Sequence, residues 1–285
     1  MRRTLSALAV LFLLLAGTVA AQWLDYKRPG VPRTPDGKPK LDAPAPKALD
    51  GKPDLSGVWM HEKTSVEEMQ RLYGAFVEEA IKVDVPGMEI GTQHKYAFNI
   101  LLDFKPADSP MRPETAAIVQ RRQAGAPPDS CTLATVPGFP LAGLLSEPIK
   151  IVQAAQITMV VYEAGGDHRQ IFTDGRTLPR EFDLPAYYGY SAGRWQGDTL
   201  IVETAGFNDK TPLDAFGHPH SDQLRVTERF RRRDFGHLDV EMTFDDPKMY
   251  SRPFTIRVPH DLLADADIFE MFPENEKDCA HMGKK

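Results

Sequence analysis

The feature that most constrains the fold is a set of short segments in which apolar and polar residues alternate. From residue 149 onward these segments are rich in β-branched and aromatic side chains, and turns such as Gly165-Gly166 and Gln196-Gly197 separate them. Short alternating segments joined by glycine turns are typical of an antiparallel sheet that curls into a barrel or sandwich. We therefore expect a mainly β protein with an antiparallel β-barrel, and strands at 149–153, 157–162, 168–173, 187–195, 198–204, 223–233, 237–244 and 254–258.

Two helical segments precede these strands. Residues 64–83 carry apolar side chains at helical spacing, and Ser65 and Glu68 form a capping-box pair at their start. A shorter helix is expected from Pro113 to Gly125, because proline favours the first helical position and glycine the position beyond the end. With an opening strand at 55–59, we expect a single barrel-like domain over residues 55–285 with one or two accessory helices.

The first 21 residues have the pattern of a secretory signal peptide. Arg2 and Arg3 precede an uncharged apolar run over residues 5–19, and small residues end at Ala21. The run is shorter than the roughly 20 residues that span a bilayer, and no later run is long and apolar enough. We expect cleavage near Ala21 and a soluble mature protein, periplasmic or secreted, without a membrane span.

A Pro-rich leader over residues 22–54 follows the signal segment. In it the tetrapeptide Asp36-Gly37-Lys38-Pro39 recurs as Asp50-Gly51-Lys52-Pro53. Asp-Gly and Lys-Pro steps interrupt regular structure rather than build strands. We expect an extended leader that lies on the domain or stays mobile.

The charge limits the classes of binding partner, and the cysteine content bears on the redox environment of the protein. The chain has 34 Lys and Arg against 40 Asp and Glu, whereas nucleic-acid binding needs a basic face. No G-x-G-x-x-G or phosphate loop opens a helix, so a nucleotide cofactor has no support. The two cysteines, Cys131 and Cys279, most simply form one disulfide in an exported protein, and two free buried thiols are the alternative.

The densest polar constellation, residues 217–222, stands before an alternating strand. In an extended chain Glu228 shares one face with apolar residues, and four arginines and a threonine take the other face. The two sets are Leu224, Val226 and Phe230 beside Glu228, and Arg225, Thr227, Arg229, Arg231 and Arg233 opposite. We therefore expect the arginine face in solvent and Glu228 on the inner wall, as a general acid or base. Alternatively Glu228 pairs with an interior arginine, for which Arg194 is a candidate.

Three further residues, His218, His220 and Asp222, continue the line of Glu228 towards the barrel mouth. We expect them to orient Glu228 or share its proton as catalytic residues. A His-x-His pair can also hold a divalent metal, although the cupin pattern fails because Leu224 stands where cupins place a glutamate. A nucleophile elbow is missing, so a Ser-His-Asp hydrolase has no support.

Candidate substrate-binding residues lie on an aromatic strand and in polar turns. Tyrosine hydroxyls on a cavity wall donate hydrogen bonds to a ligand, and loops near a barrel mouth often bind substrate. The candidates are Tyr188, Tyr190, Arg194, Asp209 and Asp174. Asp174 or Asp222 with Glu228 would alternatively supply the carboxylate pair of a glycoside hydrolase.

Four motifs resemble a family of exported bacterial proteins for which no activity is settled. They are GRWQGDTL at 193–200, GFNDKT at 206–211, GHPHSD at 217–222 and TERF at 227–230. The likeness extends from residue 55 to the C-terminus, and it implies export and a common architecture. Relatives often carry a cysteine near Phe272, which bears on the partner of Cys131. Gly57-Val58-Trp59 also resembles the first strand of calycin and lipocalin barrels.

These observations favour a secreted barrel enzyme without an organic cofactor. It would act on a small apolar or aromatic molecule by acid–base chemistry, as a lyase, isomerase or hydrolase. The alternatives are a non-catalytic periplasmic binding protein, a metal-dependent enzyme that uses His218 and His220, and a structural domain with a filled core. The enzyme hypothesis requires Glu228, His220 and a tyrosine hydroxyl to converge on one cavity.

Overall fold

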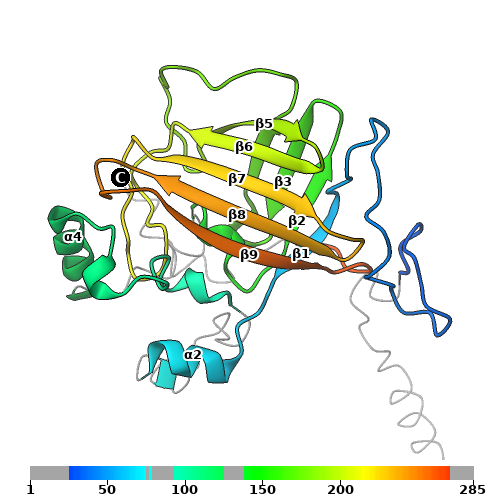
Figure 1. The fold of residues 1–285 in the computed structure, drawn as a ribbon, viewed down its shortest axis with the longest axis horizontal. Coiled ribbons are helices and arrows are strands. Elements are labelled where there is room, and N and C mark those ends of the chain that lie inside the picture. Colours follow the sequence, from blue (N-terminus) through cyan, green and yellow to red (C-terminus); the bar gives the residue numbers. More distant parts are fainter. Residues whose placement is uncertain (1–25, 75–76, 79–92, 125–137, 270–285) are drawn as a thin grey trace, which may run out of the picture.

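The computed structural model describes residues 26–74, 77–78, 93–124 and 138–269 of the chain. Nine strands in these ranges form one closed barrel in chain order, and β1 pairs with β9 to complete the ring (Figure 1). The strands are β1 (Gly57–His61), β2 (Ile149–Gln153), β3 (Ile157–Tyr162), β4 (His168–Phe172), β5 (Tyr190–Gln196), β6 (Thr199–Ala205), β7 (Arg225–Arg232), β8 (His237–Asp245) and β9 (Phe254–Leu262). The predicted mainly β fold and its barrel are confirmed.

One junction departs from the expected antiparallel pattern. β4 and β5 run parallel and share just two residue pairs, Ile171 with Ser191 and Phe172 with Ala192. The connection between them, residues 173–189, is long enough for a parallel crossover, which a tight hairpin turn cannot make. The sheet is therefore mixed and mostly antiparallel, and a specifically calycin-like topology is not established.

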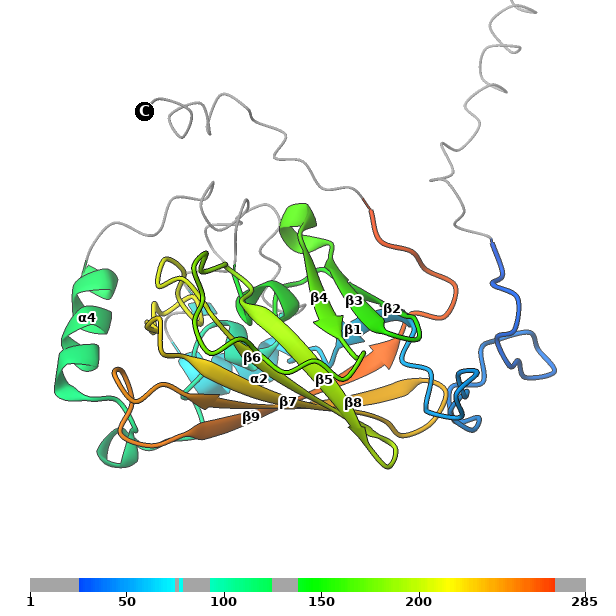
Figure 2. The ribbon, with the colours of Figure 1, turned by 90° about the horizontal axis from the view of Figure 1, so that it is seen from above.

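Two α-helices of the described residues, α2 (Val66–Tyr73) and α4 (Pro113–Ala124), lie outside the barrel (Figure 1). α4 agrees with the predicted second helix, and Figures 1 and 2 place it at one end of the barrel. α2 begins as predicted, since the Ser65 hydroxyl accepts the backbone N–H of Glu68 at 3.2 Å. α2 ends at Tyr73, where Gly74 caps it with a positive φ of 52°, and residues 77–78 are helical again within the predicted range. Most of the remaining range lies outside the described residues.

The Asp-Gly-Lys-Pro repeat folds into two equivalent turns. The N–H of Gly37 donates to the carbonyl of Thr34 at 2.8 Å, and the N–H of Gly51 donates to that of Ala48 at 2.9 Å. Both glycines have positive φ, 84° and 79°, which side chains other than glycine rarely adopt. The same short sequence thus produces the same local structure twice.

The described part of the leader packs on the domain, which is one of the two alternatives considered above. Figures 1 and 2 place it at the barrel end opposite α4. The carbonyl of Leu41 accepts the N–H of Gly236 at 2.8 Å, and Arg33 forms an ion pair with Asp265 at 2.6 Å. Ala43 is buried in the main core. The leader therefore covers the barrel end that contains the β7–β8 turn.

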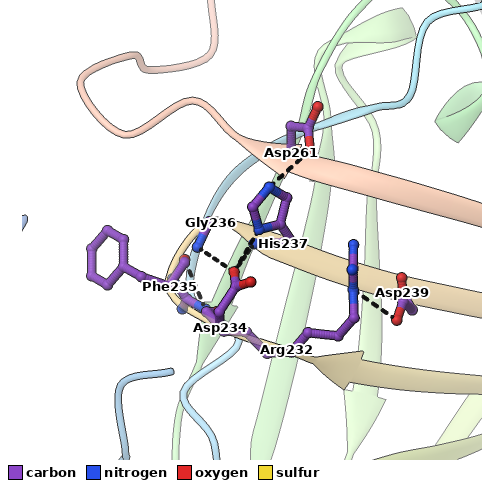
Figure 3. Close-up of polar contacts among 8 residues, drawn as sticks. Arg232, Asp234, Phe235, Gly236, His237, Asp239 and Asp261 are labelled. Atoms are coloured by element: carbon purple, nitrogen blue, oxygen red, sulfur yellow. Dashed lines mark hydrogen bonds and ion pairs between the residues drawn. The ribbon is translucent and has the colours of Figure 1, made fainter. Parts of the chain in front are cut away.

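The β7–β8 turn is held by one carboxylate (Figure 3). Asp234 accepts the N–H groups of Gly236 and His237 at 3.0 and 2.9 Å, and it contacts Nδ1 of His237 at 2.6 Å. Asp234 thus stabilises the turn from within, in addition to the contacts that the leader makes with Gly236. The His237 side chain is 31% exposed.

A buried arginine closes the barrel beneath the leader. Arg232 is 5% exposed and donates to the carbonyls of Asp54 at 2.6 Å and Phe235 at 3.2 Å. Its guanidinium carbon lies 4.8 Å from the centre of the Trp59 ring, and the Trp59 indole donates to the carbonyl of Leu55 at 2.9 Å. These contacts tie β7 to the first strand and to the end of the leader.

The predicted alternation along β7 is confirmed. Its buried and exposed residues alternate along the whole strand, with the apolar set and Glu228 inside and the arginines at odd positions outside. No helix in the described parts of the chain is long and apolar enough to cross a membrane. The predicted signal peptide at residues 1–21 and the predicted disulfide between Cys131 and Cys279 lie outside the described residues.

Candidate functional site: a buried ion pair inside the barrel

An ion pair between Arg169 on β4 and Glu228 on β7 lies inside the barrel. Both side chains are 2% exposed. Nη1 of Arg169 donates to one carboxylate oxygen of Glu228 at 3.0 Å, and Nη2 donates to the other. Two parallel hydrogen bonds of this kind are the strongest geometry for a guanidinium and a carboxylate. Glu228 therefore lies on the inner wall, as expected, but its partner is Arg169 and not Arg194.

Two hydroxyls fix the guanidinium from the other side. Nε of Arg169 donates to Ser191 on β5 at 2.9 Å, and Nη2 donates to Thr204 on β6 at 2.9 Å. The two hydroxyls also bond to each other at 3.0 Å. The network thus joins four neighbouring strands, and it compensates in part for the desolvation of two buried charges.

A small cavity of about 20 Å³ adjoins the ion pair. This is room for about one water molecule. Its polar lining comes from Tyr162, Arg169, Glu228 and His260. The rest of the wall is mainly apolar and consists of Phe139, Pro140, Gly143, Ile149, Val160, Phe230, Val240 and Met242. One polar corner in an otherwise apolar chamber can orient a small molecule.

The two titratable neighbours of the pair differ in what they can do. Burial raises the pKa of Tyr162, which therefore keeps its proton. Burial, and then the nearby His61, lowers the pKa of His260 to about 3, so this imidazole is neutral at neutral pH. Nδ1 of His260 lies 2.9 Å from the carbonyl of Val258, and with its proton on Nδ1 the ring leaves Nε2 as an acceptor.

Two phenylalanines separate this chamber from the predicted histidine cluster. The Phe139 ring centre lies 4.8 Å from the guanidinium carbon of Arg169, and the ring stacks on Phe207 with centres 5.9 Å apart. The His220 ring packs edge-on against Phe207, with ring centres 5.8 Å apart. His220 therefore does not reach Glu228, and His260 is the histidine that lines the same cavity as the glutamate.

The predicted substrate-binding residue Tyr188 lies next to the chamber. It is 8% exposed, and its ring stacks on Tyr162 with centres 5.2 Å apart. Its hydroxyl is buried and has no hydrogen-bond partner among the residues that the structure describes. A buried hydroxyl without a partner is costly, so this group is available to a ligand or a water molecule.

The histidine cluster is held by acids that the sequence pattern did not single out. Nδ1 of His218 lies 2.5 Å from the fully buried carboxylate of Asp214, which also accepts the N–H of His218 at 3.1 Å. Nδ1 of His220 lies 3.2 Å from the carbonyl of Ser221. Asp222 is exposed and pairs with Lys248 at 2.6 Å, so it does not orient Glu228.

The other candidate binding residues face away from the chamber. Arg194 pairs with Glu203 on the barrel surface at 2.7 Å, and the exposed Tyr190 donates to the carbonyl of Leu184 at 2.6 Å. Two aspartates lie in polar turns: Asp174 pairs with Arg176, and Asp209 is exposed.

These candidates are not brought to Glu228, because odd and even positions on one strand face opposite sides. Within the described ranges, no group of three or more His, Cys, Asp or Glu side chains could hold a metal ion.

The residues that complete the chamber come from distant parts of the sequence. Arg169 and Ile171 are both buried while their neighbours on β4 are exposed or partly so. The same alternation that identified Glu228 would therefore have placed Arg169 inside. Alternation along β9 and β3 likewise places His260 and Tyr162 inside, but which inner residues share one cavity depends on which strands meet across the barrel.

Comparison with known proteins finds no protein-family model, no curated protein and no solved structure that matches this chain. The closed barrel is loosely consistent with the calycin-like resemblance, and membership of the exported family stays a prediction.

Proposed function

We propose that this chain is an exported β-barrel protein that binds a small, partly apolar or aromatic molecule inside the barrel. The observation that carries the proposal is the Arg169–Glu228 pair, fixed by Ser191 and Thr204 at the edge of an apolar chamber. A buried ion pair is often no more stabilising than apolar residues of the same volume. Because stability alone does not explain such a pair, we assign it the role of binding the polar group of a ligand.

A molecule larger than water needs more room than the cavity gives. The Phe139 ring lies directly over the guanidinium of Arg169. In the proposal, the apolar or aromatic part of the ligand takes the place of this ring, and its polar group hydrogen-bonds to Glu228 or to the hydroxyl of Tyr188. A cation over an aromatic face is favourable by about 0.5–2 kcal/mol, which the exchange would preserve.

Native mass spectrometry of the protein exported from a bacterial host tests the proposal. We expect a bound organic molecule on the wild type and its loss in the double variant Arg169→Met/Glu228→Leu. Removal of both charges avoids an unpaired buried ion, so this variant should still fold, which circular dichroism would check. Bare wild-type mass, or an equal amount of ligand on the folded double variant, would contradict the proposal.

Acid–base catalysis on the same molecule is the second candidate. It is favoured by one observation, that Glu228, Tyr162 and His260 line a single cavity. The ion pair requires the anionic form of Glu228, so Glu228 would accept a proton and Tyr162 would donate one. The protein would then be a lyase, isomerase or hydrolase without an organic cofactor. Turnover of the mass-identified molecule, lost in Tyr162→Phe while binding persists, would distinguish an enzyme from a binding protein.

A metal-dependent enzyme that uses His218 and His220 is the third candidate, and the same native mass spectrometry tests it. A divalent ion on the wild type that disappears in His218→Ala/His220→Ala would favour it. The outcome expected here is that both proteins carry the same ligand and neither carries the ion, because the described residues contain no group of three or more His, Cys, Asp or Glu side chains that could hold a metal ion.

A further inference from the structure

A second hollow lies on the outer face of the barrel, separate from the interior chamber. This groove has a volume of about 460 Å³ and runs over the outward side of β6 to β9. Its volume falls within the range of small-molecule sites. The charged residues that line it are Arg229, Arg231, Asp239, Glu241 and Arg257.

Both acids of the groove already have partners. Glu241 accepts from Nε of Arg257 at 2.9 Å. Asp239 forms an ion pair with Nε of Arg233 at 3.0 Å, which is the dashed line to Asp239 in Figure 3. Each carboxylate thus contacts an arginine other than Arg229 and Arg231.

The two remaining arginines, Arg229 and Arg231, form no hydrogen bond or ion pair with any residue in the described parts of the chain. Both are exposed, and both point outward from β7 because they are two residues apart. Their backbones are about 6–7 Å apart along the strand, so both side chains leave the same face of β7 within reach of one small molecule. Their cross-strand neighbours in register are the two acids paired elsewhere.

We propose that this groove binds a small organic molecule with two carboxylates, one on each of Arg229 and Arg231. A guanidinium matches a carboxylate with two parallel hydrogen bonds, and here two such groups lack a counter-ion on the wall of one groove. The chain as a whole has a net charge of −6, so this is a local site and not part of a generally basic surface.

Isothermal titration at low ionic strength with adipate, against hexanoate as a monocarboxylate of equal length, tests the proposal. We expect adipate to bind at least fivefold more tightly than hexanoate. Arg229→Gln and Arg231→Gln should each weaken adipate binding at least fivefold. Arg225→Gln is the matched control, because Arg225 is exposed on the same face of β7 and does not line the groove.

The outcomes that would overturn the site are specific. Equal affinity for adipate and hexanoate would show that the two arginines do not act together. A loss in Arg225→Gln as large as that in Arg229→Gln would show a diffuse effect of surface charge. Absence of binding to the wild type would also overturn it. Exposed substitutions of this kind change stability by about 0.5 kcal/mol or less, so thermal unfolding should confirm that every variant is folded.

Discussion

The guanidinium of Arg232 lies 4.8 Å from the Trp59 ring centre and joins the end of β7 to the first strand. It also reaches the backbone carbonyl of Asp54, where the leader meets the barrel. One buried side chain thus fastens three segments that are far apart in the sequence. Burial lowers the pKa of Arg232 to about 10, which leaves it charged at neutral pH.

Replacement of Arg232 by methionine should therefore be costly. The variant keeps the apolar stem but loses the cation over Trp59 and leaves buried carbonyls without a donor. We expect a loss of about 3 kcal/mol in the free energy of unfolding, measured with denaturant. Arg231→Met, one residue away on the exposed face, should change it by about 0.5 kcal/mol or less. Equal losses in the two variants would contradict the role of Arg232.

The contributions of Arg169 and Glu228 to the free energy of unfolding should be strongly coupled. Glu228→Gln leaves the charge of Arg169 buried without a counter-ion and should cost about 3–5 kcal/mol. The double variant Arg169→Met/Glu228→Leu should cost less than the single variant. A double-mutant cycle of unfolding free energies measures this coupling.

The exposed pair Arg194–Glu203 supplies the control for that cycle. Its two partners are 56% and 49% exposed, so its coupling energy should be about 1 kcal/mol or less. Additive losses at Arg169 and Glu228 would show that the two residues contribute independently, against the structure.

Three buried histidines should make the fold sensitive to acid. The rings of His61 and His94 lie 5.5 Å apart, and His61 pairs in register with His260. Burial lowers the pKa of all three, that of His260 to about 3. The unfolded chain, with pKa values near 6.5, then binds more protons than the folded chain. Their contribution to stability is complete above about pH 6.5 and is lost as the pH falls, and for His260 the loss between its two pKa values is about 1.4 kcal/mol per pH unit.

The slope of unfolding free energy between pH 6 and 4 checks this prediction. His260→Gln should reduce the slope by about 1.4 kcal/mol per pH unit, whatever its effect at neutral pH. His237→Gln, at a half-exposed site, is the comparison variant. If both substitutions leave the slope unchanged, buried histidines do not cause the acid sensitivity.

Cleavage of a signal peptide during export would reduce the mass of the recovered protein by a known amount. If residues 1–21 are a signal peptide, the protein recovered from the periplasm or the medium should begin at Gln22. Intact mass and N-terminal sequencing measure this directly. A recovered chain that still begins at Met1, or one found in the membrane fraction, would contradict cleavage near Ala21.

Local patterns predicted much of the fold, because strands and helices leave periodic traces in the sequence. Alternation along β7 identified Glu228 as an inner residue, and the glycine turns marked most strand ends. The break at Gly74 was missed, because the apolar spacing continues across this glycine and residues 77–78 are helical again. The capping pair at Ser65 was recognised because its signal is local.

The partner of Glu228 was missed for a different reason. Arg194 and Arg169 were both available by composition, and the choice depends on which side of each strand faces inward. Arg194 pairs in register with Ile201 on the outer side of the sheet, whereas Arg169 shares the inner side with Ser191. Such relationships arise when the ring closes, and no segment of the chain contains them by itself.

The Arg169–Glu228 ion pair also stabilises the parallel junction between β4 and β5. With two residue pairs in register, this junction is the weakest backbone connection in the ring. Arg169 spans it with side-chain hydrogen bonds, since it leaves β4 and reaches Ser191 on β5 and then β6 and β7. The guanidinium thus holds β4 and β5 together at a junction where they share only two residue pairs. A molecule that draws Arg169 towards itself would at the same time release the side-chain hydrogen bonds that reinforce this junction.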